Sequence, residues 1–332
     1  MALINLASNA HISDVTRLTL RMEAQLMEDN RALFEPRAVQ DVVVRMQVDV
    51  SGSASILCEK DAKVIKSIPA RLKKDPYILR LTEAKKAFAE QYRRTRRLFE
   101  EAMEEETAFT VAEISLLMTN PVARPVLGSL VFGSGDRFGL MDKGNLVDVN
   151  GDRILLSGED LLFVAHPVHL QKAGVWTAWQ RRLFADRRVQ PFKQVFRELY
   201  VKTREELGRT ESLRYSGNQI QPGRAAACLK TRRWIADPEM GLQKVYYKEN
   251  VIVNLYAQAD WFTPADAEAP ALEWVAFTDR RTHEPMKIDD LPDVLFFEAM
   301  RDVDLAVSAA HAGQVDPETS LLQSRCALPC WS

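Results

Sequence analysis

Residues 75–106 read DPYILRLTEAKKAFAEQYRRTRRLFEEAMEEE, and this stretch predicts one long helix. Asp75 can accept hydrogen bonds from the free N–H groups of a first helical turn, and Pro76 is tolerated at the first helical position. Apolar and small side chains then recur at spacings of three and four, which lines one face of a helix. These residues are Leu81, Ala84, Phe88, Tyr92, Thr95, Phe99 and Ala102. We therefore expect an amphipathic helix over about residues 76–106.

The charges on the other faces of this helix run in an unusual order. Basic residues come first, namely Lys85, Lys86, Arg93, Arg94, Arg96 and Arg97, and acidic residues come last, namely Glu100, Glu101 and Glu104 to Glu106. This order opposes the helix macrodipole, which favours acids at the start and bases at the end. Arg–Glu pairs four residues apart can offset the cost, so a solvated face is the favoured interpretation. The alternative is a nucleic-acid surface formed by Arg93, Arg94, Arg96 and Arg97.

Short β-like runs lie on both sides of the helix. A first antiparallel meander is predicted by Val42–Val50, Ala54–Cys58 and Lys63–Pro69. The turn signals GSGD, DKGN and NGD separate the strands of a second meander, which are Leu127–Phe132, Phe138–Met141, Leu146–Val149 and Arg153–Leu156. Further strands are predicted at Arg233–Ala236, Gln243–Tyr247, Val251–Ala259 and Leu272–Thr278.

Shorter helical patterns complete the chain. They are predicted at Ser13–Asn30, Thr110–Met118, Pro222–Arg232 and Pro292–Ala310. Strands and helices do not alternate as βαβ units, so the fold class is α+β, with small antiparallel meanders combined with amphipathic helices. We expect an N-terminal domain over residues 1–119, an α+β domain over 120–318 and an irregular tail over 319–332.

Composition excludes several classes of protein. The 332-residue chain is 46% hydrophobic and 27% charged with a net charge of −2, which is ordinary for a globular protein and does not attract polyanions. No apolar run approaches the roughly 18 residues that span a bilayer, and the N-terminus lacks a signal-peptide pattern. We therefore expect a cytoplasmic protein with no membrane partner. The four cysteines lack zinc spacing and predict reduced structural thiols.

The motifs of several enzyme and cofactor classes are missing from the sequence. Gly133–Asp136 lacks the residues that complete a phosphate-binding loop and predicts a hairpin turn instead. The acid-rich run Asp142–Asp152 lacks the ligand order of a calcium loop, so turn chemistry is the favoured interpretation. Neither a nucleophile elbow nor an HExxH zinc motif occurs. We therefore predict no metal and no cofactor.

Residues 166–200 combine aromatic and polar side chains, which is costly unless every buried polar group finds a partner. Pro167 is expected to start a helix with His166 in the capping position. The pair His166 and His169 therefore favours a cap and a surface residue over a metal pair or a general base. Gln190-Pro191 is expected to start a second helix. Its register would align Gln190, Gln194, Arg197 and Glu198 as a structural hydrogen-bond network or, as the less favoured alternative, a ligand contact.

The predicted last helix carries a second polar cluster, formed by Glu298, Arg301, Asp302 and Asp304. Glu298 and Asp302 are four residues apart and would share a face, which suits acid–base chemistry or a divalent ion. No nucleophile accompanies them. Salt bridges to Arg197, Arg233 or Arg301 are therefore the favoured interpretation.

Four segments together resemble one bacterial family: Ala165–Pro167, Gln190–Tyr200, Arg232–Trp234 and Phe297–Leu305. They are similar to the domain of unknown function numbered 4132 (DUF4132), whose members include proteins of the molybdate metabolism regulator (MolR) type. Lys66–Pro76 and the following helix also resemble the large proteins that carry this domain, so the resemblance covers about residues 40–320. It implies a regulatory association and no demonstrated reaction. It also implies that this chain is the C-terminal part of a longer protein, ended early.

Three hypotheses of function follow. The leading one is a non-catalytic interaction or regulatory module of a large cytoplasmic bacterial protein, with the rest of that protein or a regulatory protein as its partner. An enzyme is the first alternative, with catalytic candidates His166, Arg197, Glu198 and Asp302 and binding candidates Gln190, Gln194, Arg233 and Arg301. It requires His166, Arg197, Glu198, Arg233 and Asp302 to converge in one cleft. The second alternative is a nucleic-acid-associated module that uses Arg93, Arg94, Arg96 and Arg97.

Overall fold

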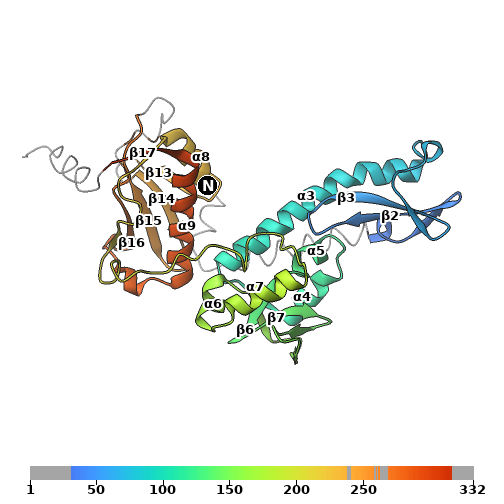
Figure 1. Cartoon of the computed structure of the whole chain (residues 1–332), viewed down its shortest axis with the longest axis horizontal. Coiled ribbons are helices and arrows are strands. Elements are labelled where there is room, and N and C mark those ends of the chain that lie inside the picture. The colour runs from blue at the N-terminus through green and yellow to red at the C-terminus, as the bar shows by residue number, and fades with distance from the viewer. Residues whose placement is uncertain (1–30, 238–240, 258, 260, 262–267, 316–332) are drawn as a thin grey trace, which may run out of the picture. The chain divides into compact units, whose positions relative to one another are not determined.

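The computed structural model describes residues 31–237, 241–257, 259, 261 and 268–315. They form parts of two compact units, an N-terminal unit up to Arg197 and a C-terminal unit from Glu198 onward (Figure 1). Strands pair in antiparallel sheets and helices pack beside them, which confirms the α+β class. The boundary expected between residues 119 and 120 lies inside the N-terminal unit, where one hydrophobic core runs from Leu33 to Phe192. The helix expected at 13–30 and the tail expected at 319–332 lie outside the described residues.

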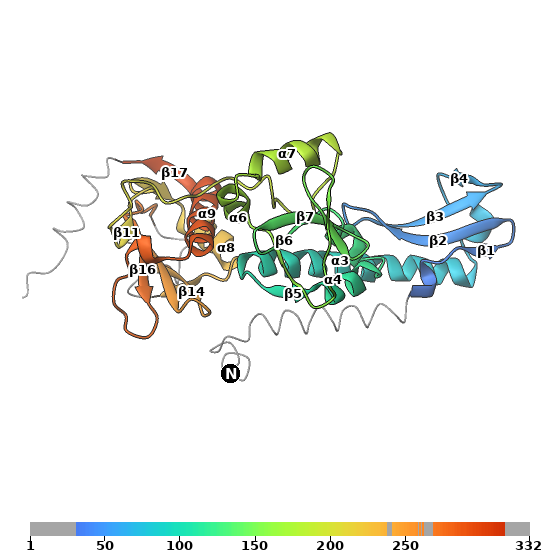
Figure 2. The same cartoon turned by 90° about the horizontal axis from the view of Figure 1, so that it is seen from below.

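Helix α3 (Pro76–Glu104) confirms the long helix expected over residues 76–106. The Asp75 carboxylate caps it by accepting hydrogen bonds from the backbone N–H groups of Tyr77 and Ile78, at 2.8 and 3.4 Å. Within the N-terminal unit, α3 runs from the first sheet to the second (Figure 2). Its buried face includes six of the seven expected residues, namely Leu81, Phe88, Tyr92, Thr95, Phe99 and Ala102.

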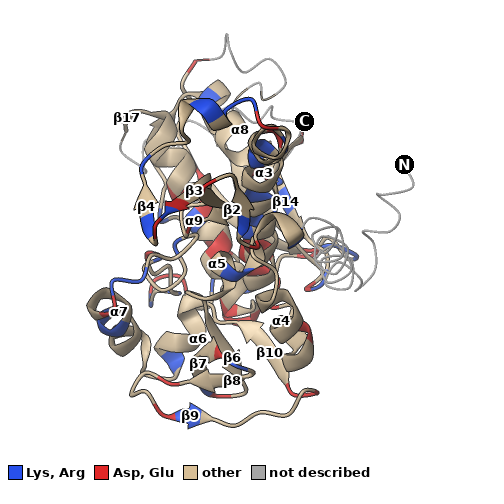
Figure 3. Ribbon diagram, turned by 90° about the vertical axis from the view of Figure 1, so that its right-hand side faces the viewer, with Lys and Arg blue, Asp and Glu red and all other residues tan. Residues whose placement is uncertain are grey.

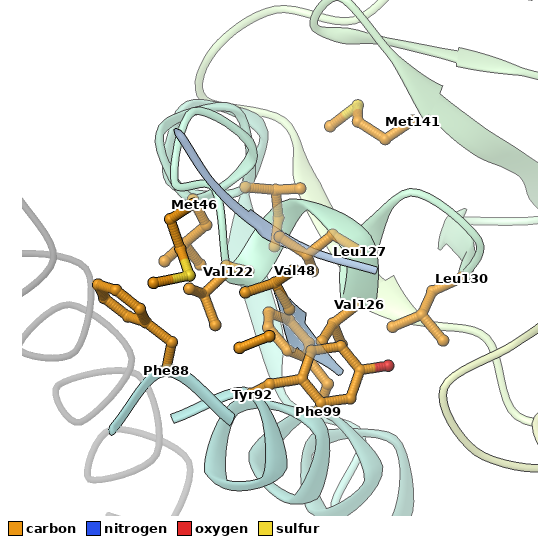
Figure 4. Packing of buried hydrophobic residues seen from close by; sticks show 14 of the residues in the cluster. Met46, Val48, Phe88, Tyr92, Phe99, Val122, Val126, Leu127, Leu130 and Met141 are labelled. Carbon is orange, nitrogen blue, oxygen red and sulfur yellow. The ribbon is translucent and has the colours of Figure 1, made fainter. Parts of the chain in front are cut away.

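The first meander forms a four-stranded sheet in the order β1-β2-β3-β4. Its strands are β1 (Arg37–Val39), β2 (Val42–Val48), β3 (Ala54–Lys60) and β4 (Lys63–Ile65). The short 3-10 helices η1 (Arg31–Leu33) and η2 (Ala70–Leu72) lie before and after them in the chain. Alternate residues of β2 are buried, as the pleat of a one-sided strand requires. Among them, Met46 and Val48 lie beside Phe88 and Tyr92 of α3 (Figure 4).

The second meander belongs to a larger sheet with the order β5-β10-β6-β7-β8-β9. Strands β6 (Val131–Ser134), β7 (Arg137–Asp142), β8 (Asn145–Val147) and β9 (Arg153–Ile154) confirm the expected hairpins. Strands β5 (Ala108–Thr110) and β10 (Leu161–Val164) extend the sheet beyond the prediction.

Two short helices connect β5 to β6. Helix α4 (Val111–Met118) begins with the expected capping box, in which Thr110 and Glu113 each accept a backbone N–H of the other at 3.2 and 2.9 Å. The strand expected from Leu127 starts later, because Leu127 ends helix α5 (Ala123–Leu127). The cause is Asn120, whose side-chain oxygen accepts the N–H groups of residues 122 and 123 and so starts a new turn.

Helix α6 (Pro167–Lys172) begins at Pro167 as predicted, and α7 (Trp176–Ala185) follows it. The helix expected from Gln190 is wrong, because residues 188–200 form bends, turns and extended backbone. Gln190, Gln194, Arg197 and Glu198 therefore do not share a helical face. Their side chains instead bond to distant backbone, as the site below explains.

The C-terminal unit contains a five-stranded sheet in the order β11-β16-β15-β14-β13. Its strands are β11 (Glu211–Ser212), β13 (Ile235–Asp237), β14 (Gly241–Tyr246), β15 (Val251–Tyr256) and β16 (Trp274–Asp279). A separate pair joins β12 (Asn218–Ile220) and β17 (His311–Gln314). The strand expected from Arg233 starts two residues later, since Arg233 takes a left-handed φ of 69°.

Helices α8 (Pro222–Lys230) and α9 (Asp293–Ala310) pack on this sheet and share its core (Figure 1). The short 3-10 helix η3 (Ile288–Asp290) precedes α9. Both α-helices begin close to where the sequence predicts them. The apolar stripe expected on α9 understates its burial, because every residue from Val294 to Val303 is buried. Glu298, Arg301 and Asp302 are thus core residues.

Gly139 of β7 tests the packing of the larger sheet. A Cβ atom there would lie 2.7 Å from the Leu146 Cβ atom and 2.8 Å from the Val147 carbonyl oxygen, both in the paired strand β8. Since backbone must then shift, we expect Gly139→Ala to lower the free energy of unfolding by about 1–3 kcal/mol. Urea denaturation would measure this loss. Gly158→Ala is the control, because a Cβ atom at Gly158 would have its nearest neighbour at 3.8 Å. Equal losses of stability in the two variants would contradict the close approach of β7 and β8 at Gly139.

Candidate functional site

Gln194 is a fully buried polar side chain that binds the start of β6. Its amide oxygen accepts the backbone N–H of Val131 at 3.0 Å, and its amide nitrogen donates to the carbonyls of Val131 and Ala165 at 2.7 and 2.8 Å. The same oxygen also accepts a hydrogen bond from Gln190 at 2.8 Å. The side-chain amide therefore bonds to β6 as a peptide group of a neighbouring strand would.

Gln190, four residues before Gln194, also uses its side-chain amide to bond to backbone groups. Its amide nitrogen donates to the Ser129 carbonyl at 3.0 Å, and its oxygen accepts the backbone N–H of Val195 at 3.0 Å. The Val195 carbonyl in turn accepts hydrogen bonds from the side chains of Trp176 and Gln180, at 2.8 and 3.3 Å. Backbone groups that a helix would use internally are thus satisfied by side chains. This explains why the segment is irregular despite its helical spacing.

Arg197 anchors the end of the segment to α3. Its guanidinium is fully buried and lies 2.6 Å from a carboxylate oxygen of Glu100 and 3.5 Å from one of Glu104. The Nε atom also donates to the Lys193 carbonyl at 2.9 Å. The acidic residues at the end of α3 are therefore partly neutralised by Arg197, which lies far away in the sequence. The exposed Arg97–Glu101 pair adds a second ion pair within α3.

The two histidines cap α6 reciprocally. The Nδ1 atom of His166 accepts the Val168 backbone N–H at 3.3 Å, and the Nδ1 atom of His169 accepts the His166 backbone N–H at 3.2 Å. His169 must then carry its proton on Nε2, which lies 2.9 Å from a Glu106 oxygen. One nitrogen of each ring is therefore committed to the backbone, which disfavours a metal pair. Among the described residues, no cluster of three His, Cys, Asp or Glu could hold a metal ion.

The other candidates lie in the C-terminal unit with partners of their own. Asp302 accepts hydrogen bonds from Trp234 Nε1 at 3.0 Å and Lys244 Nζ at 2.7 Å, and Arg232 Nε lies 3.6 Å from it. The expected salt bridge thus uses Arg232 and Lys244 in place of Arg233.

Glu298 pairs with Arg301 at 3.5 Å, which was one of the expected pairs. Asp304 accepts the Tyr200 hydroxyl at 2.8 Å. Burial and this hydrogen bond raise the pKa of Tyr200, so its hydroxyl remains a donor. Glu198 is exposed, and the partners of Asp302 are Trp234, Lys244 and Arg232.

The four arginines proposed for nucleic acid, Arg93, Arg94, Arg96 and Arg97, are exposed on α3. Basic and acidic residues occur together on the helices of the molecule (Figure 3). No described helix is long and apolar enough to cross a membrane.

The N-terminal unit also contains a groove that no motif in the sequence indicates. Its volume is about 1080 Å³, and its walls come from β2, the α4–α5 region, β7, β8 and the segment around α7. The apolar part includes Met46, Val48, Leu140 and Met141. Five arginines line it as well, namely Arg45, Arg124, Arg182, Arg187 and Arg188.

Carboxylates of the groove are already engaged. Asp49 accepts the Ser51 hydroxyl at 2.6 Å and the N–H groups of Ser51 and Ser53, and these bonds hold the pKa of Asp49 below its usual range. Asp142 lies 3.4 Å from Arg153. Asp148 accepts two backbone N–H groups of its own turn. None of them neutralises an arginine of the groove in the described contacts.

The arginines differ in how they are engaged. Arg182 and Arg188 share Asp186, at 2.8 and 3.7 Å, and Arg45 pairs with Glu59 at 3.3 Å, outside the groove lining. Arg124 and Arg187 are exposed and form no ion pair within the described part of the chain.

Ser129 connects the groove to the buried glutamines. Its carbonyl accepts the Gln190 amide, and Arg188 holds the neighbouring Gly128 carbonyl at 2.8 Å. The Ser129 hydroxyl is buried and has no hydrogen-bond partner among the described residues. The network therefore fixes a groove wall that includes an unsatisfied hydroxyl group.

A family model described as a domain of unknown function (DUF4132) matches residues 62–234, more than half of the 332 residues. The chain belongs to the DUF4132 family. The match is narrower than the resemblance expected over residues 40–320, and the segment Phe297–Leu305 lies outside it. No curated protein and no solved structure matches the chain. The DUF4132 match includes the glutamine network and all of the groove lining except Phe34 and residues 45–50.

Gln194→Leu tests the network. The substitution keeps the side chain's size but leaves the Val131 N–H and the Ala165 carbonyl without this partner, while the Val131 carbonyl still accepts the Ala165 N–H at 2.9 Å. Since each unsatisfied buried group costs about 1–3 kcal/mol, we expect a loss of at least about 2 kcal/mol in the free energy of unfolding. Chemical denaturation would measure it. Gln171→Leu, the same change at an exposed position of α6, should leave stability within about 0.5 kcal/mol.

The Lys244–Asp302 pair is suited to a double-mutant cycle. Asp302→Ala would leave the buried Lys244 ammonium without its 2.7 Å partner, which should cost about 3–5 kcal/mol. Adding Lys244→Met removes the cation that had lost this carboxylate, so the double variant should recover part of that loss. Thermal unfolding of the three variants would test this. Additive losses would show that the two side chains are not coupled.

Proposed function

We propose that this DUF4132 chain is a non-catalytic protein-interaction module whose binding surface is the groove. The observation that carries the proposal is the contrast between two sets of polar groups. His166, Arg197 and Asp302 are buried and hydrogen-bonded or ion-paired. Groove residues such as Arg124 and Arg187 are exposed and form no ion pair in the described contacts.

This contrast weighs against the enzyme alternative. A general acid or base must reach the proton that it transfers, and a nucleophile needs an adjacent base. His166 caps a helix and is fully buried, while Arg197 is held between Glu100 and Glu104. These roles support a structural use of the polar stretch 166–200.

The resemblance to proteins of the MolR type supports a regulatory role in a larger protein of the bacterial cytoplasm. The nucleic-acid alternative receives less support, because Arg97 pairs with Glu101 at 3.0 Å and the chain has a net charge of −2. A solvated face accounts for the exposed arginines of α3.

Site-specific photocrosslinking in bacterial cells tests the proposal. A photoreactive phenylalanine analogue at Val189, an exposed groove residue, should form a discrete protein adduct. The same analogue at Val64, which is similarly exposed on β4 and outside the groove lining, should not.

Blocking the groove provides the matched control. Val50→Trp places a bulky ring at an exposed lining residue and should abolish the Val189 adduct. Val43→Trp, at an exposed position of β2 outside the lining, should leave the adduct unchanged. Equal adducts from positions 189 and 64, or an adduct insensitive to Val50→Trp, would overturn the proposed function.

A further inference from the structure

The size of the groove indicates the kind of ligand that could fill it. Small-molecule sites occupy about 300–1000 Å³. At about 1080 Å³ the groove lies at the upper end of that range, and it draws its walls from elements between Phe34 and Val189. Such a space is large enough for a short segment of polypeptide.

The charges of the groove indicate which polypeptide would bind. Five arginines and three aspartates line it, and the aspartates are engaged by turns or by Arg153. Arg124 and Arg187 remain exposed and unpaired within the described residues. Because guanidinium groups bind carboxylates with two parallel hydrogen bonds, acidic side chains are their complementary partners.

The Ser129 hydroxyl supplies an independent observation. It is buried in the groove wall without a hydrogen-bond partner in the described structure, and Ser129 as a whole is only 5% exposed. An unsatisfied buried hydroxyl costs free energy that a polar ligand group could recover. A carboxylate or a peptide carbonyl could accept a hydrogen bond from it.

The apolar lining sets the remaining requirement. Met46, Val48, Leu140 and Met141 line the groove with side chains that are only 2–7% exposed. The flexible thioether of methionine lets such a lining adapt to varied apolar side chains. A purely acidic peptide would leave this surface without a partner. An apolar side chain between acidic ones would fill it.

We propose that the groove binds an extended segment of a partner protein in which acidic residues alternate with large apolar residues. Arg124 and Arg187 bind its carboxylates, and Ser129 donates a hydrogen bond to it. Its apolar side chains contact the lining formed by Met46, Val48, Leu140 and Met141. This inference rests on the proposed function, and it adds the chemical class of the partner.

Selection from a randomised display library of short peptides on the full chain tests the inference. We expect the selected peptides to be enriched in Asp and Glu next to Leu, Met or Phe. Their affinity, measured by fluorescence anisotropy, should fall as salt is raised, since exposed charge pairs are screened.

Charge reversal identifies the residues responsible. Arg124→Glu with Arg187→Glu should weaken binding of the selected peptides by at least about tenfold. Arg181→Glu with Arg224→Glu reverses two exposed arginines outside the groove lining and should change the affinity by less than about twofold. Thermal unfolding of both double variants would confirm that each is folded.

Ser129→Ala gives a readout that a merely structural role would not move. It should weaken peptide binding while leaving the free chain as stable as the parent or more stable, because it removes an unsatisfied group. A destabilised chain with unchanged affinity would contradict the role of Ser129.

The outcomes separate the two proposals. If the selected peptides are neutral or basic but lose binding in the Val50→Trp variant, the proposed ligand class is wrong and the proposed interaction module is retained. Selected peptides that are unaffected by Val50→Trp would place binding elsewhere and overturn both. Peptides that retain full affinity for the Arg124→Glu, Arg187→Glu variant would also overturn the ligand class.

Discussion

The N-terminal unit depends on one buried amide, that of Gln194. Its hydrogen bonds hold the start of β6 and the residue after β10, and its contact with Gln190 extends the hold to Ser129. In a low-dielectric interior, each of these bonds is strong when made and costly when missing. The same irregular segment also holds Gly128 through Arg188. One set of interactions therefore joins part of the core to the groove wall around Gly128 and Ser129.

The reversed charge order of α3 has its explanation in the same segment. Acidic residues at a helix C-terminus oppose the macrodipole, and alone they would destabilise α3. Here Glu100 and Glu104 receive the buried guanidinium of Arg197, and Glu106, just past the helix, faces His169 Nε2 at 2.9 Å. The acidic end thus serves as a docking point for the chain that follows the second sheet. This accounts for a pattern that otherwise suggests an external polyanion.

Local signals in the sequence predicted the elements whose hydrogen bonds are local. Asp75 caps α3, Thr110 and Glu113 form the capping box of α4, and Pro167 starts α6. The spacing of Gln190 and Gln194 also fits a helix, yet their amides bond to backbone groups of Ser129 and Val131, some sixty positions away. Spacing alone does not reveal where a long polar side chain finds its partner. The groove escaped prediction for a related reason, since its walls are brought together by the tertiary fold.

The buried polar side chains of the segment around Gln194 differ from Ser129 in whether they have hydrogen-bond partners. Gln194, Arg197 and His166 are buried beside partners supplied by the chain itself. The Ser129 hydroxyl is buried as well, but the described residues supply it no partner, although alanine would avoid the cost. Departures from local consistency of this kind concentrate at functional sites, where a ligand completes what the fold leaves open. Ser129 lies on a groove wall that the buried glutamines hold, and the unpaired Arg124 and Arg187 line the same groove, which argues for binding. Of the residues first considered for catalysis, His166, Arg197 and Asp302 are buried and already bound to partners within the chain, whereas Glu198 is exposed.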